Sequence, residues 1–358
     1  KNKEDEWLCK RLVNEALLAL THHGTGPSHI NVPVVGSYNY YECIELPKER
    51  KITILNPIVD KIDWKKYSDK LAVVDRILVV VGQNIIFSEN DIQYMNTFYE
   101  KYNCVYAIEH LSNLSCDGCV SSYPITEMLG NEAFNELLPQ VVISIGNNLS
   151  AYQLKPVLRK NYESIENWYV SCEGEVRDVY KCLTNIFECS ISDFFENMVR
   201  FAEKNKKNSQ EYYFDWKNKY LQIKEKEYQF SNFFVAKELA KIIPEYSILH
   251  TAILNSTRVM QFFPLAKGVR TFSNVGTLGI DGCFSTFAGA ASSTEHLAFL
   301  LIGDLSFFYD MNAAGLRSIG NNVRVILLNN GGGSEFHFFM GKDKIPTIDE
   351  YICAEHSK

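Results

Sequence analysis

Two apolar runs near the end of the chain, residues 300–302 and 323–328, constrain the fold most, because each run stops at residues suited to binding an ion. The first run is followed by Gly303, Asp304, Leu305 and Ser306, and the second by two asparagines and three glycines. Short apolar runs on either side of a helix-compatible stretch are typical of neighbouring parallel strands. The pattern therefore predicts a strand–turn–helix–strand unit with an oxygen-rich mouth.

The residues of this mouth suit a hard cation and the phosphates that it carries. Mg²⁺ prefers octahedral oxygen ligands, and Asp304, Asn330 and a loop glycine could supply a carboxylate, an amide and a carbonyl oxygen. The N–H groups of Leu305 and Ser306 would open a helix and face an anion. The alternative is a capped helix and a Gly-rich turn that bind nothing. That alternative leaves an ionised Asp at the end of a buried strand without a partner.

A third element lies just upstream of this unit. The loop 273–282 contains Gly-Ile-Asp-Gly, and residues 284–291 form a stretch of mostly small side chains that could pack closely on a sheet. With these elements in order, the sequence resembles the thiamine-diphosphate-dependent enzymes, whose signature is Gly-Asp followed one helix and one strand later by Asn-Asn. The sequence is similar to the 2-succinyl-5-enolpyruvyl-6-hydroxy-3-cyclohexene-1-carboxylate synthases of the menaquinone pathway in the segments 13–22, 26–33, 274–286 and 303–332.

The resemblance implies a binding site for thiamine diphosphate and Mg²⁺ shared between two subunits. It implies that the metal ligands are the side chains of Asp304 and Asn330 and the carbonyl of Gly332. The cofactor-binding residues that it implies are Asn274, Gly279, Ile280, Leu305 and Ser306. Among them, Ile280 matches the apolar residue that props the cofactor into a V shape, and Gly279 matches the carbonyl that faces its amino group.

The implied reaction is decarboxylation of 2-oxoglutarate and addition of the product to isochorismate, a carboligase (transferase) activity. At two positions where the family places an arginine that faces an acidic substrate, this chain has Val275 and Met260, which cannot pair with a carboxylate. Arg258 could compensate. The substrate pocket is expected to involve Ser256, Arg258, Met260, Val275, Glu335 and Phe336. Two alternatives remain open: the same cofactor acting on different substrates, and a non-catalytic relative that keeps the fold.

The composition is that of an ordinary globular protein, with 46% hydrophobic and 22% charged residues among 358. The net charge is −7 and the sequence has no long stretch rich in Lys and Arg, which argues against nucleic acid as a partner. No apolar run has the length of a membrane span, and no signal-peptide core is present, so we expect a cytoplasmic protein. The family resemblance implies that its partners are a small 2-oxo acid and an acceptor. The pair Cys116 and Cys119 stands alone, and we interpret it as reduced structural thiols.

Apolar runs that alternate with helical stretches predict the fold class: α/β, with two doubly wound parallel-sheet domains. The expected division is a remnant of the first, pyrimidine-binding domain (1–35), a linker (36–60), a central Rossmann-like domain (61–203), a helical linker (204–230) and an incomplete diphosphate- and Mg-binding domain (231–358). Residues 29–34 are predicted to form a short strand. Ser88 and Ser231 are predicted to cap helices.

The chain therefore looks truncated at both ends relative to the family. The glutamate that activates the cofactor would lie in the part of the first domain that this sequence lacks, so no catalytic residue is assigned here. The chain alone is expected to be inactive, and the full-length protein is expected to be a homodimer or homotetramer.

Overall fold

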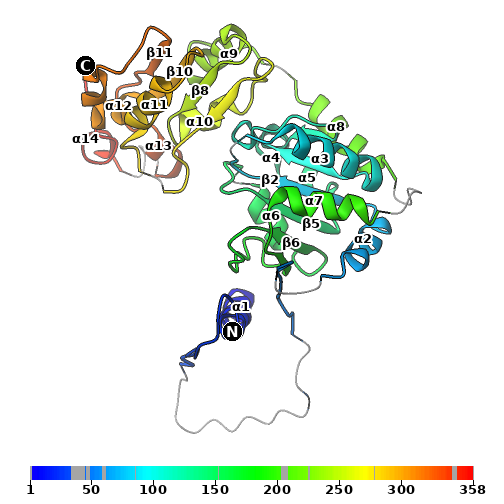
Figure 1. Cartoon of the computed structure of the whole chain (residues 1–358). Helices are drawn as coiled ribbons and strands as arrows, with labels where there is room; N and C mark the ends of the chain where they lie inside the picture. Colours follow the sequence, from blue (N-terminus) through cyan, green and yellow to red (C-terminus); the bar gives the residue numbers. More distant parts are fainter. Residues whose placement is uncertain are drawn as a thin grey trace.

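The computed structural model describes residues 2–33, 45, 49–58, 62–84, 86–151, 153–202, 209–224, 226–277, 279–340 and 345–357. They form two parallel β-sheets, one of seven strands and one of four, with helices packed on both faces of each (Figure 1). The predicted fold class, α/β with two doubly wound parallel-sheet domains, is confirmed.

The central domain is built on the seven-stranded sheet, whose order is β1-β7-β6-β5-β2-β3-β4. Its strands are β1 (Thr53–Leu55), β2 (Ile77–Val81), β3 (Val105–Ile108), β4 (Cys119–Ser121), β5 (Val141–Ile145), β6 (Glu166–Val170) and β7 (Leu183–Phe187). Its helices are α2 (Trp64–Ala72), α3 (Glu89–Tyr102), η1 (His110–Ser112), α4 (Ser122–Met128), α5 (Gly130–Asn135), α6 (Leu154–Lys160), α7 (Ile191–Arg200) and α8 (Glu211–Leu221).

Strand β2 shows why a continuous apolar run gives a buried parallel strand. All five of its residues are buried, and successive side chains point to opposite faces of the sheet. Ile77, Val79 and Val81 join the core on one face, and Leu78 and Val80 join the core on the other. A strand with helices on both sides has no polar face, which is why its sequence does not alternate.

The last domain is built on the four-stranded sheet, whose order is β11-β10-β8-β9. Its strands are β8 (Ile248–Thr251), β9 (Arg270–Phe272), β10 (Ala298–Gly303) and β11 (Val323–Leu328). Its helices are α9 (Asn232–Ile242), α10 (Asn255–Met260), α11 (Cys283–Ser292), α12 (Asp304–Tyr309), η2 (Met311–Gly315), α13 (Glu335–Phe339) and α14 (Ile348–Tyr351).

Both predicted helix caps are confirmed. Ser88 and Asp91 form a capping box at the start of α3, in which each side chain binds the backbone N–H of the other residue. The Ser231 hydroxyl accepts a hydrogen bond from Phe234 N at 3.3 Å at the start of α9. Each cap fixes where the chain turns from a loop into a helix.

The N-terminal segment contains one long helix, α1 (Lys3–Ala19), whose side chains contact the central domain although none of its residues is buried. The Trp7 indole donates a hydrogen bond to Asp178 Oδ2 at 2.7 Å. The strand predicted over residues 29–34 is wrong for residues 29–33, which are exposed and pair with no described strand; residue 34 lies outside the described part. The stretch expected to be a linker contributes β1, which pairs with β7.

The two α/β domains contact each other through side-chain amides. Asn113, which has a left-handed backbone (φ 49°), accepts from Thr271 N at 2.8 Å and donates to Thr271 O at 2.9 Å. This side chain therefore acts as a backbone partner for β9. Gln261 accepts from His110 N at 2.8 Å, so the contact involves both domains' loops.

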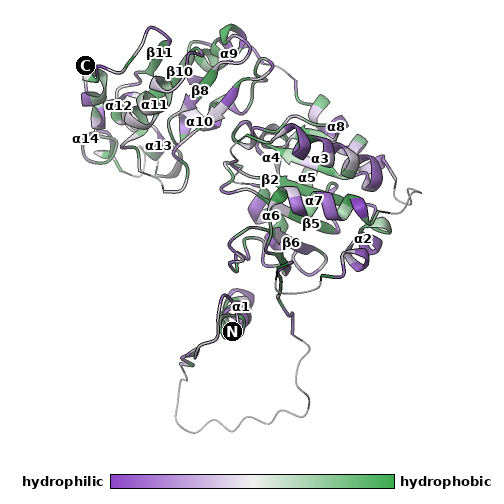
Figure 2. Ribbon diagram, in the orientation of Figure 1, coloured by the Kyte–Doolittle hydropathy of each residue, from purple (hydrophilic) through white to green (hydrophobic). Residues whose placement is uncertain are grey.

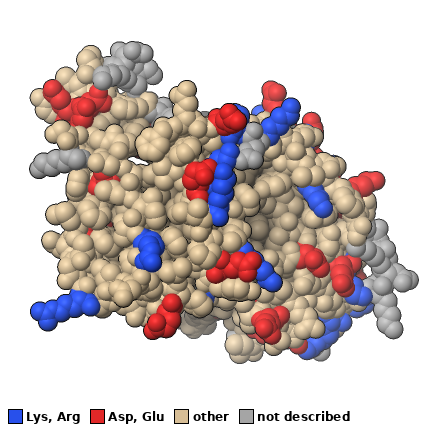
Figure 3. All heavy atoms as spheres, turned by 90° about the horizontal axis from the view of Figure 1, so that it is seen from above, with Lys and Arg blue, Asp and Glu red and all other residues tan. Residues whose placement is uncertain are grey.

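Hydropathy follows the layers in the middle of each sheet: strands β2, β5 and β10 are hydrophobic, whereas the helices combine hydrophobic and hydrophilic residues (Figure 2). On the face shown in Figure 3, acidic and basic side chains are scattered among uncharged ones, and neither sign forms a continuous stripe. Among the described residues, no helix has both the length and the apolar character needed to cross a bilayer.

Candidate functional site

The candidate metal ligands meet where β10 and β11 end. The two strands are parallel and pair up to their last residues, Gly303 and Leu328, so the residues that follow emerge side by side. Asp304 is 2% exposed and its Oδ2 atom accepts hydrogen bonds from the backbone N–H groups of Asn330 (3.1 Å), Gly331 (2.8 Å) and Gly332 (3.1 Å). The structure therefore brings the predicted carboxylate and carboxamide together.

The Asn330 carboxamide shows how a cation would fit here. One end of it lies 3.2 Å from Asp304 Oδ2 and 2.9 Å from the carbonyl oxygen of Gly332, and the other end lies 3.0 Å from Ser334 Oγ. With its nitrogen inward, the amide donates to both oxygens. Turned with its oxygen inward, the amide would add a third acceptor beside these two, and a bound cation would stabilise that orientation. A carboxylate, an amide and a carbonyl oxygen are the kinds of ligand that Mg²⁺ prefers, so these residues could hold this ion.

The segment after α14 covers the same glycine loop. Gly333 N donates to Cys353 O at 2.6 Å, and His356 N donates to Gly331 O at 2.9 Å. The imidazole Nε2 of His356 lies 3.1 Å from Asp304 Oδ2. In this structure protein groups thus surround the carboxylate, and the segment after α14 lies against the same glycine loop.

The predicted cofactor-binding residues form a connected set beside these ligands. The Ser306 hydroxyl donates to Ile280 O at 2.5 Å, which ties the Gly-Ile-Asp-Gly loop to the start of α12. Asn274 donates to Gly282 O at 3.3 Å and so closes that loop at its base. Leu305 N donates to Asp304 Oδ1 at 2.7 Å.

Gly279 is exposed, and Ile280 next to it is half-buried. A Cβ atom at Gly279 would lie 2.8 Å from Asp281 Oδ1, which is closer than real contacts of this kind. The loop therefore presents the Gly279 backbone to its surroundings, with Ile280 anchored behind it through its carbonyl.

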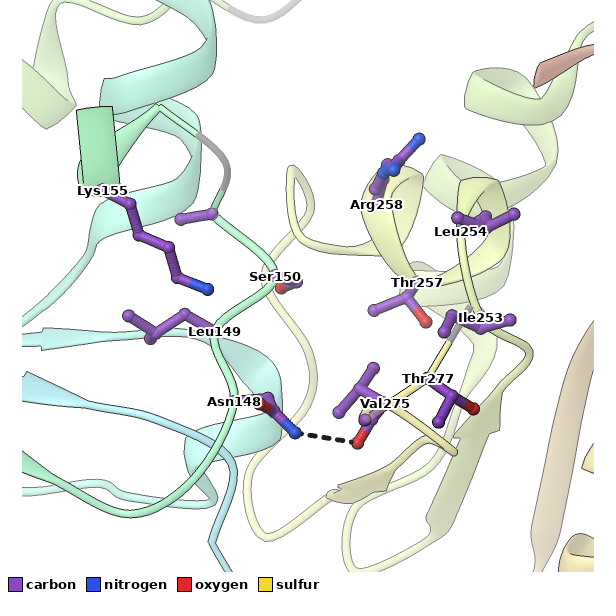
Figure 4. Close-up of a pocket in the computed structure, with 12 residues that line it drawn as sticks. Asn148, Leu149, Ser150, Lys155, Ile253, Leu254, Thr257, Arg258, Val275 and Thr277 are labelled. Carbon is purple, nitrogen blue, oxygen red and sulfur yellow. Dashed lines mark hydrogen bonds between the residues drawn. The ribbon is translucent and has the colours of Figure 1, made fainter. Parts of the chain in front are cut away.

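A cavity of about 230 Å³ lies between the two domains (Figure 4). Its walls are the loop after β5 with the start of α6, and, from the last domain, the loop after β8 with α10 and the residues after β9. In the seven-stranded sheet the strand order reverses between β2 and β5, and in the four-stranded sheet it reverses between β8 and β10. At such a point the loops that follow the neighbouring strands run to opposite faces of the sheet, which leaves a crevice at the carboxyl ends of the strands. Leu254, in the wall, has φ 70°, a conformation rare for a branched side chain.

Two cations from different domains line this cavity: Lys155 from α6 and Arg258 from α10. Burial lowers the pKa of the Lys155 ammonium, and the charge of the buried Glu109 partly offsets this effect. Arg258 Nη1 forms an ion pair with Glu335 Oε1 at 2.5 Å. A cavity with partly buried positive groups suits an anionic ligand, because solvent screens the attraction less than it would at an open surface.

The six predicted pocket residues lie in different surroundings. Arg258 and Val275 line the cavity, and Val275 O accepts a hydrogen bond from Asn148 at 3.1 Å. Glu335 pairs with Arg258, and Phe336 is 39% exposed. Ser256 and Met260 are 4% and 1% exposed, and Met260 packs in the hydrophobic core around α9.

Sequence reasoning missed the central domain's share of the cavity, Asn148, Leu149, Ser150, Ala151 and Lys155. Nothing in the local sequence marks these residues, because they become part of a site only when the two domains pack together. Buried Glu109 positions the wall: its carboxylate accepts from Ser150 N at 2.8 Å and Ala151 N at 2.6 Å. Burial raises its pKa, and these hydrogen bonds act in the opposite direction.

Cys116 and Cys119 lie with their sulfur atoms 3.3 Å apart, and both are free thiols. The hydrogen bond with Cys119 and burial raise the pKa of Cys116, so the thiolate is disfavoured. This environment favours the structural interpretation of the pair.

The fold defines the chain as a doubly wound α/β protein with a cavity at the carboxyl ends of its parallel strands, where proteins of this class bind ligands. No protein-family model matches the chain. Over 99% of its length it is homologous to 2-succinyl-5-enolpyruvyl-6-hydroxy-3-cyclohexene-1-carboxylate synthases, and the predicted resemblance to this family is confirmed.

Three relatives illustrate the similarity. The synthase of Phocaeicola vulgatus is 36% identical over 99% of this chain and 63% of its own length. That of Bacteroides thetaiotaomicron is 34% identical over 99% of this chain and 64% of its own length. That of Cytophaga hutchinsonii is 30% identical over 99% of this chain and 66% of its own length. The chain thus spans slightly less than two thirds of the curated relatives that it matches.

Proposed function

We propose that the chain is part of a thiamine-diphosphate- and Mg²⁺-dependent carboligase of the menaquinone pathway, which joins a 2-oxo acid to an acceptor. The observation that carries the proposal is the meeting of the Asp304 carboxylate, the Asn330 carboxamide and the Gly332 carbonyl where the parallel strands β10 and β11 end, because Mg²⁺ prefers oxygen ligands of these kinds. The names of the homologous synthases support the reaction class. A cytoplasmic location and a homodimeric or homotetrameric full-length protein are parts of the same proposal.

In this proposal Asp304, Asn330 and Gly332 would hold the metal ion, and the backbone around Leu305 and Ser306 would face the diphosphate. The cofactor, when bound, supplies the stabilised carbanion that decarboxylation of a 2-oxo acid requires. The protein's task is positioning. Ser306 holds the Ile280 carbonyl at 2.5 Å, which fixes the loop expected to support the cofactor's shape. Asn274 closes the same loop at its base.

For the substrates, we propose that Lys155 and Arg258 attract carboxylates into the inter-domain cavity. Both side chains line it, and the partial burial of Lys155 strengthens its interaction with an anion. Lys155 is then the group that compensates, together with Arg258, for the apolar Val275. Glu335, paired with Arg258 at 2.5 Å, would have to release it or share it when a carboxylate binds.

A second candidate function is the same cofactor chemistry on different substrates. Met260 favours it, because this residue is 1% exposed within an apolar core where no carboxylate could be stabilised. Val275 favours it too, since an apolar side chain lines the cavity at its position.

The metal assignment is tested by calorimetric titration of the full-length protein with Mg²⁺ and thiamine diphosphate. We expect the wild type and Asp75→Ala, a change at an exposed aspartate of the central domain, to bind alike. Asp304→Ala is expected to show no binding at concentrations that saturate the wild type. Because Asp304 also accepts three backbone hydrogen bonds, Asp304→Asn and circular dichroism serve to confirm that the fold persists. Equal binding by Asp304→Ala and the wild type would remove the assignment.

The substrate question needs a separate assay. Turnover of 2-oxoglutarate with isochorismate is expected to fall in Lys155→Gln through a raised KM, because a cation that attracts the substrate is lost. Negligible turnover of this pair by a protein that binds the cofactor would instead support the second candidate.

A further inference from the structure

A second group of possible metal ligands lies far along the chain from Asp304, where the segment after α1 meets the end of β7. His22 Nε2 lies 2.9 Å from Glu188 Oε2, and His23 Nε2 contacts Glu188 Oε1. One ligand atom from each of the three residues lies within 4.8 Å of the others. Two imidazoles and one carboxylate thus point at a common position.

The backbone is shaped to bring two neighbouring histidines to one point. Side chains of successive residues normally diverge, yet the His22 and His23 ring centroids are only 3.9 Å apart. His23 achieves this with φ 55°, in the left-handed region that a residue with a Cβ atom seldom adopts. Such a conformation costs about 1–2 kcal/mol, and strained residues of this kind are frequent at functional sites.

Gly174, which has no side chain, leaves room for the ligand atoms of His22 and Glu188. A Cβ atom at Gly174 would lie 2.6 Å from both Glu188 Oε2 and His22 Nε2, and the residue has φ +66°. Any other residue here would press on the two ligand atoms. The Glu188 side chain is only 5% exposed; burial alone would raise its pKa, but the two imidazoles outweigh burial and lower it, which favours the ionised form.

We propose that His22, His23 and Glu188 bind a divalent transition-metal ion of the Zn²⁺ type, which fastens the segment after α1 to the central domain. Two nitrogens and one carboxylate suit Zn²⁺ and similar ions, whereas Mg²⁺ prefers oxygens alone. Tetrahedral Zn²⁺ places its ligand atoms about 3.3 Å apart, so the 2.9 Å between His22 Nε2 and Glu188 Oε2 requires only a small opening. A water molecule would complete the shell.

The competing explanation is a metal-independent latch, in which the imidazoles simply donate hydrogen bonds to Glu188. The two explanations differ in one respect that can be measured. A latch holds the segment equally well in metal-free protein, whereas the proposed site makes the stability of the protein depend on the ion.

The experiment uses the full-length protein, freed of metal and titrated with Co²⁺ and then with Zn²⁺. Wild type is expected to bind one equivalent of Co²⁺ with the intense visible absorption of a four-coordinate ion, to lose that absorption when Zn²⁺ displaces it, and to melt at a higher temperature with Zn²⁺. His22→Gln, His23→Gln and Glu188→Gln are each expected to weaken Zn²⁺ binding by roughly tenfold or more.

Two control variants isolate the site. His29→Gln changes an exposed histidine on the same segment and is expected to bind like the wild type. Asp304→Asn is expected to retain Co²⁺ binding while affecting Mg²⁺, so failure of the proposed cofactor site would not be confused with failure of this one. Circular dichroism confirms that each variant is folded. Absence of stoichiometric Co²⁺ or Zn²⁺ binding by the wild type, or binding that survives in all three ligand variants, would overturn the proposal.

Discussion

The histidine at the centre of β8 gives the sharpest quantitative prediction. His250 is 5% exposed, its ring packs between Phe272 and Phe287 at centroid distances of 5.3 and 5.4 Å, and its Nε2 atom has no hydrogen-bond partner among the described residues. Burial in these surroundings lowers its pKa from 6.5 to about 4. The folded protein therefore resists protonating this ring, while the unfolded chain does not.

The direction of the effect follows from the depressed pKa. At pH 7.5 and above the ring is almost wholly neutral in both states and contributes little pH dependence. As the pH falls from 6.5 towards 4, the unfolded chain binds a proton that the folded protein excludes, so stability is lost. At pH 5 the loss from His250 amounts to about 2 kcal/mol relative to pH 7.5.

The measurement compares the free energy of unfolding of the wild type and His250→Leu, followed by circular dichroism in guanidinium chloride at pH 7.5 and pH 5. The difference between the two proteins is expected to change by about 2 kcal/mol in favour of the variant at the lower pH. Other titrating groups cancel in this difference, among them His110, whose pKa burial also lowers to about 4. His296→Leu, a change at an exposed histidine, is expected to keep the wild-type pH dependence. A change below about 0.5 kcal/mol for His250→Leu would refute the reasoning.

Two further substitutions test the packing of the candidate site. Gly332→Ala is expected to lower the free energy of unfolding in urea by about 1–3 kcal/mol, because the residue has φ +153° and a Cβ atom would lie 2.9 Å from Cys353 O; an unchanged stability would contradict the contact between this loop and the following segment. Glu109→Gln is expected to cost about 1–3 kcal/mol in the same assay, because an amide nitrogen would face the N–H groups of Ser150 or Ala151; a neutral result would mean that this wall of the cavity is held by other contacts.

The sequence predicted secondary structure best where a local pattern of residues has a single physical explanation. The apolar runs at 77–81 and 141–145 form β2 and β5 as predicted, because a strand buried on both faces needs an uninterrupted apolar sequence. Ser88 and Ser231 cap their helices, because a hydroxyl at that position satisfies an otherwise unpaired N–H. Local chemistry decides such features, so a local pattern reveals them.

Features that depend on distant partners were not visible. Strand β1 has three residues, and its pairing of Thr53 with Asn185 involves segments far apart in sequence. The run 29–34 has strand propensity, but residues 29–33 find no neighbouring strand, and propensity without a hydrogen-bond partner does not make a strand. The role of Lys155 was also not visible in the sequence, because this residue lines a cavity with Arg258 only after the two domains have packed.

In the candidate site, too, the contacts that a local sequence motif marks could be predicted and the others could not. Asp304 and Asn330 could be paired from sequence, because both follow strands that run in parallel and end together. The contact of His356 with Asp304 could not, since no motif connects these residues. The ion pair between Arg258 and Glu335 was also missed, although both had been assigned to the pocket.

Strand β11 has a consequence for handling this protein. Among the described strands it lies at the edge of the four-stranded sheet, and Val325 and Leu327, on one face of it, are 39% and 40% exposed. An uncovered, hydrophobic edge offers open backbone groups to any other extended chain. Poor solubility and self-association through this edge are therefore the expected behaviour when residues 1–358 are expressed by themselves, and a charged residue in place of Val325 is the substitution most suited to suppress it.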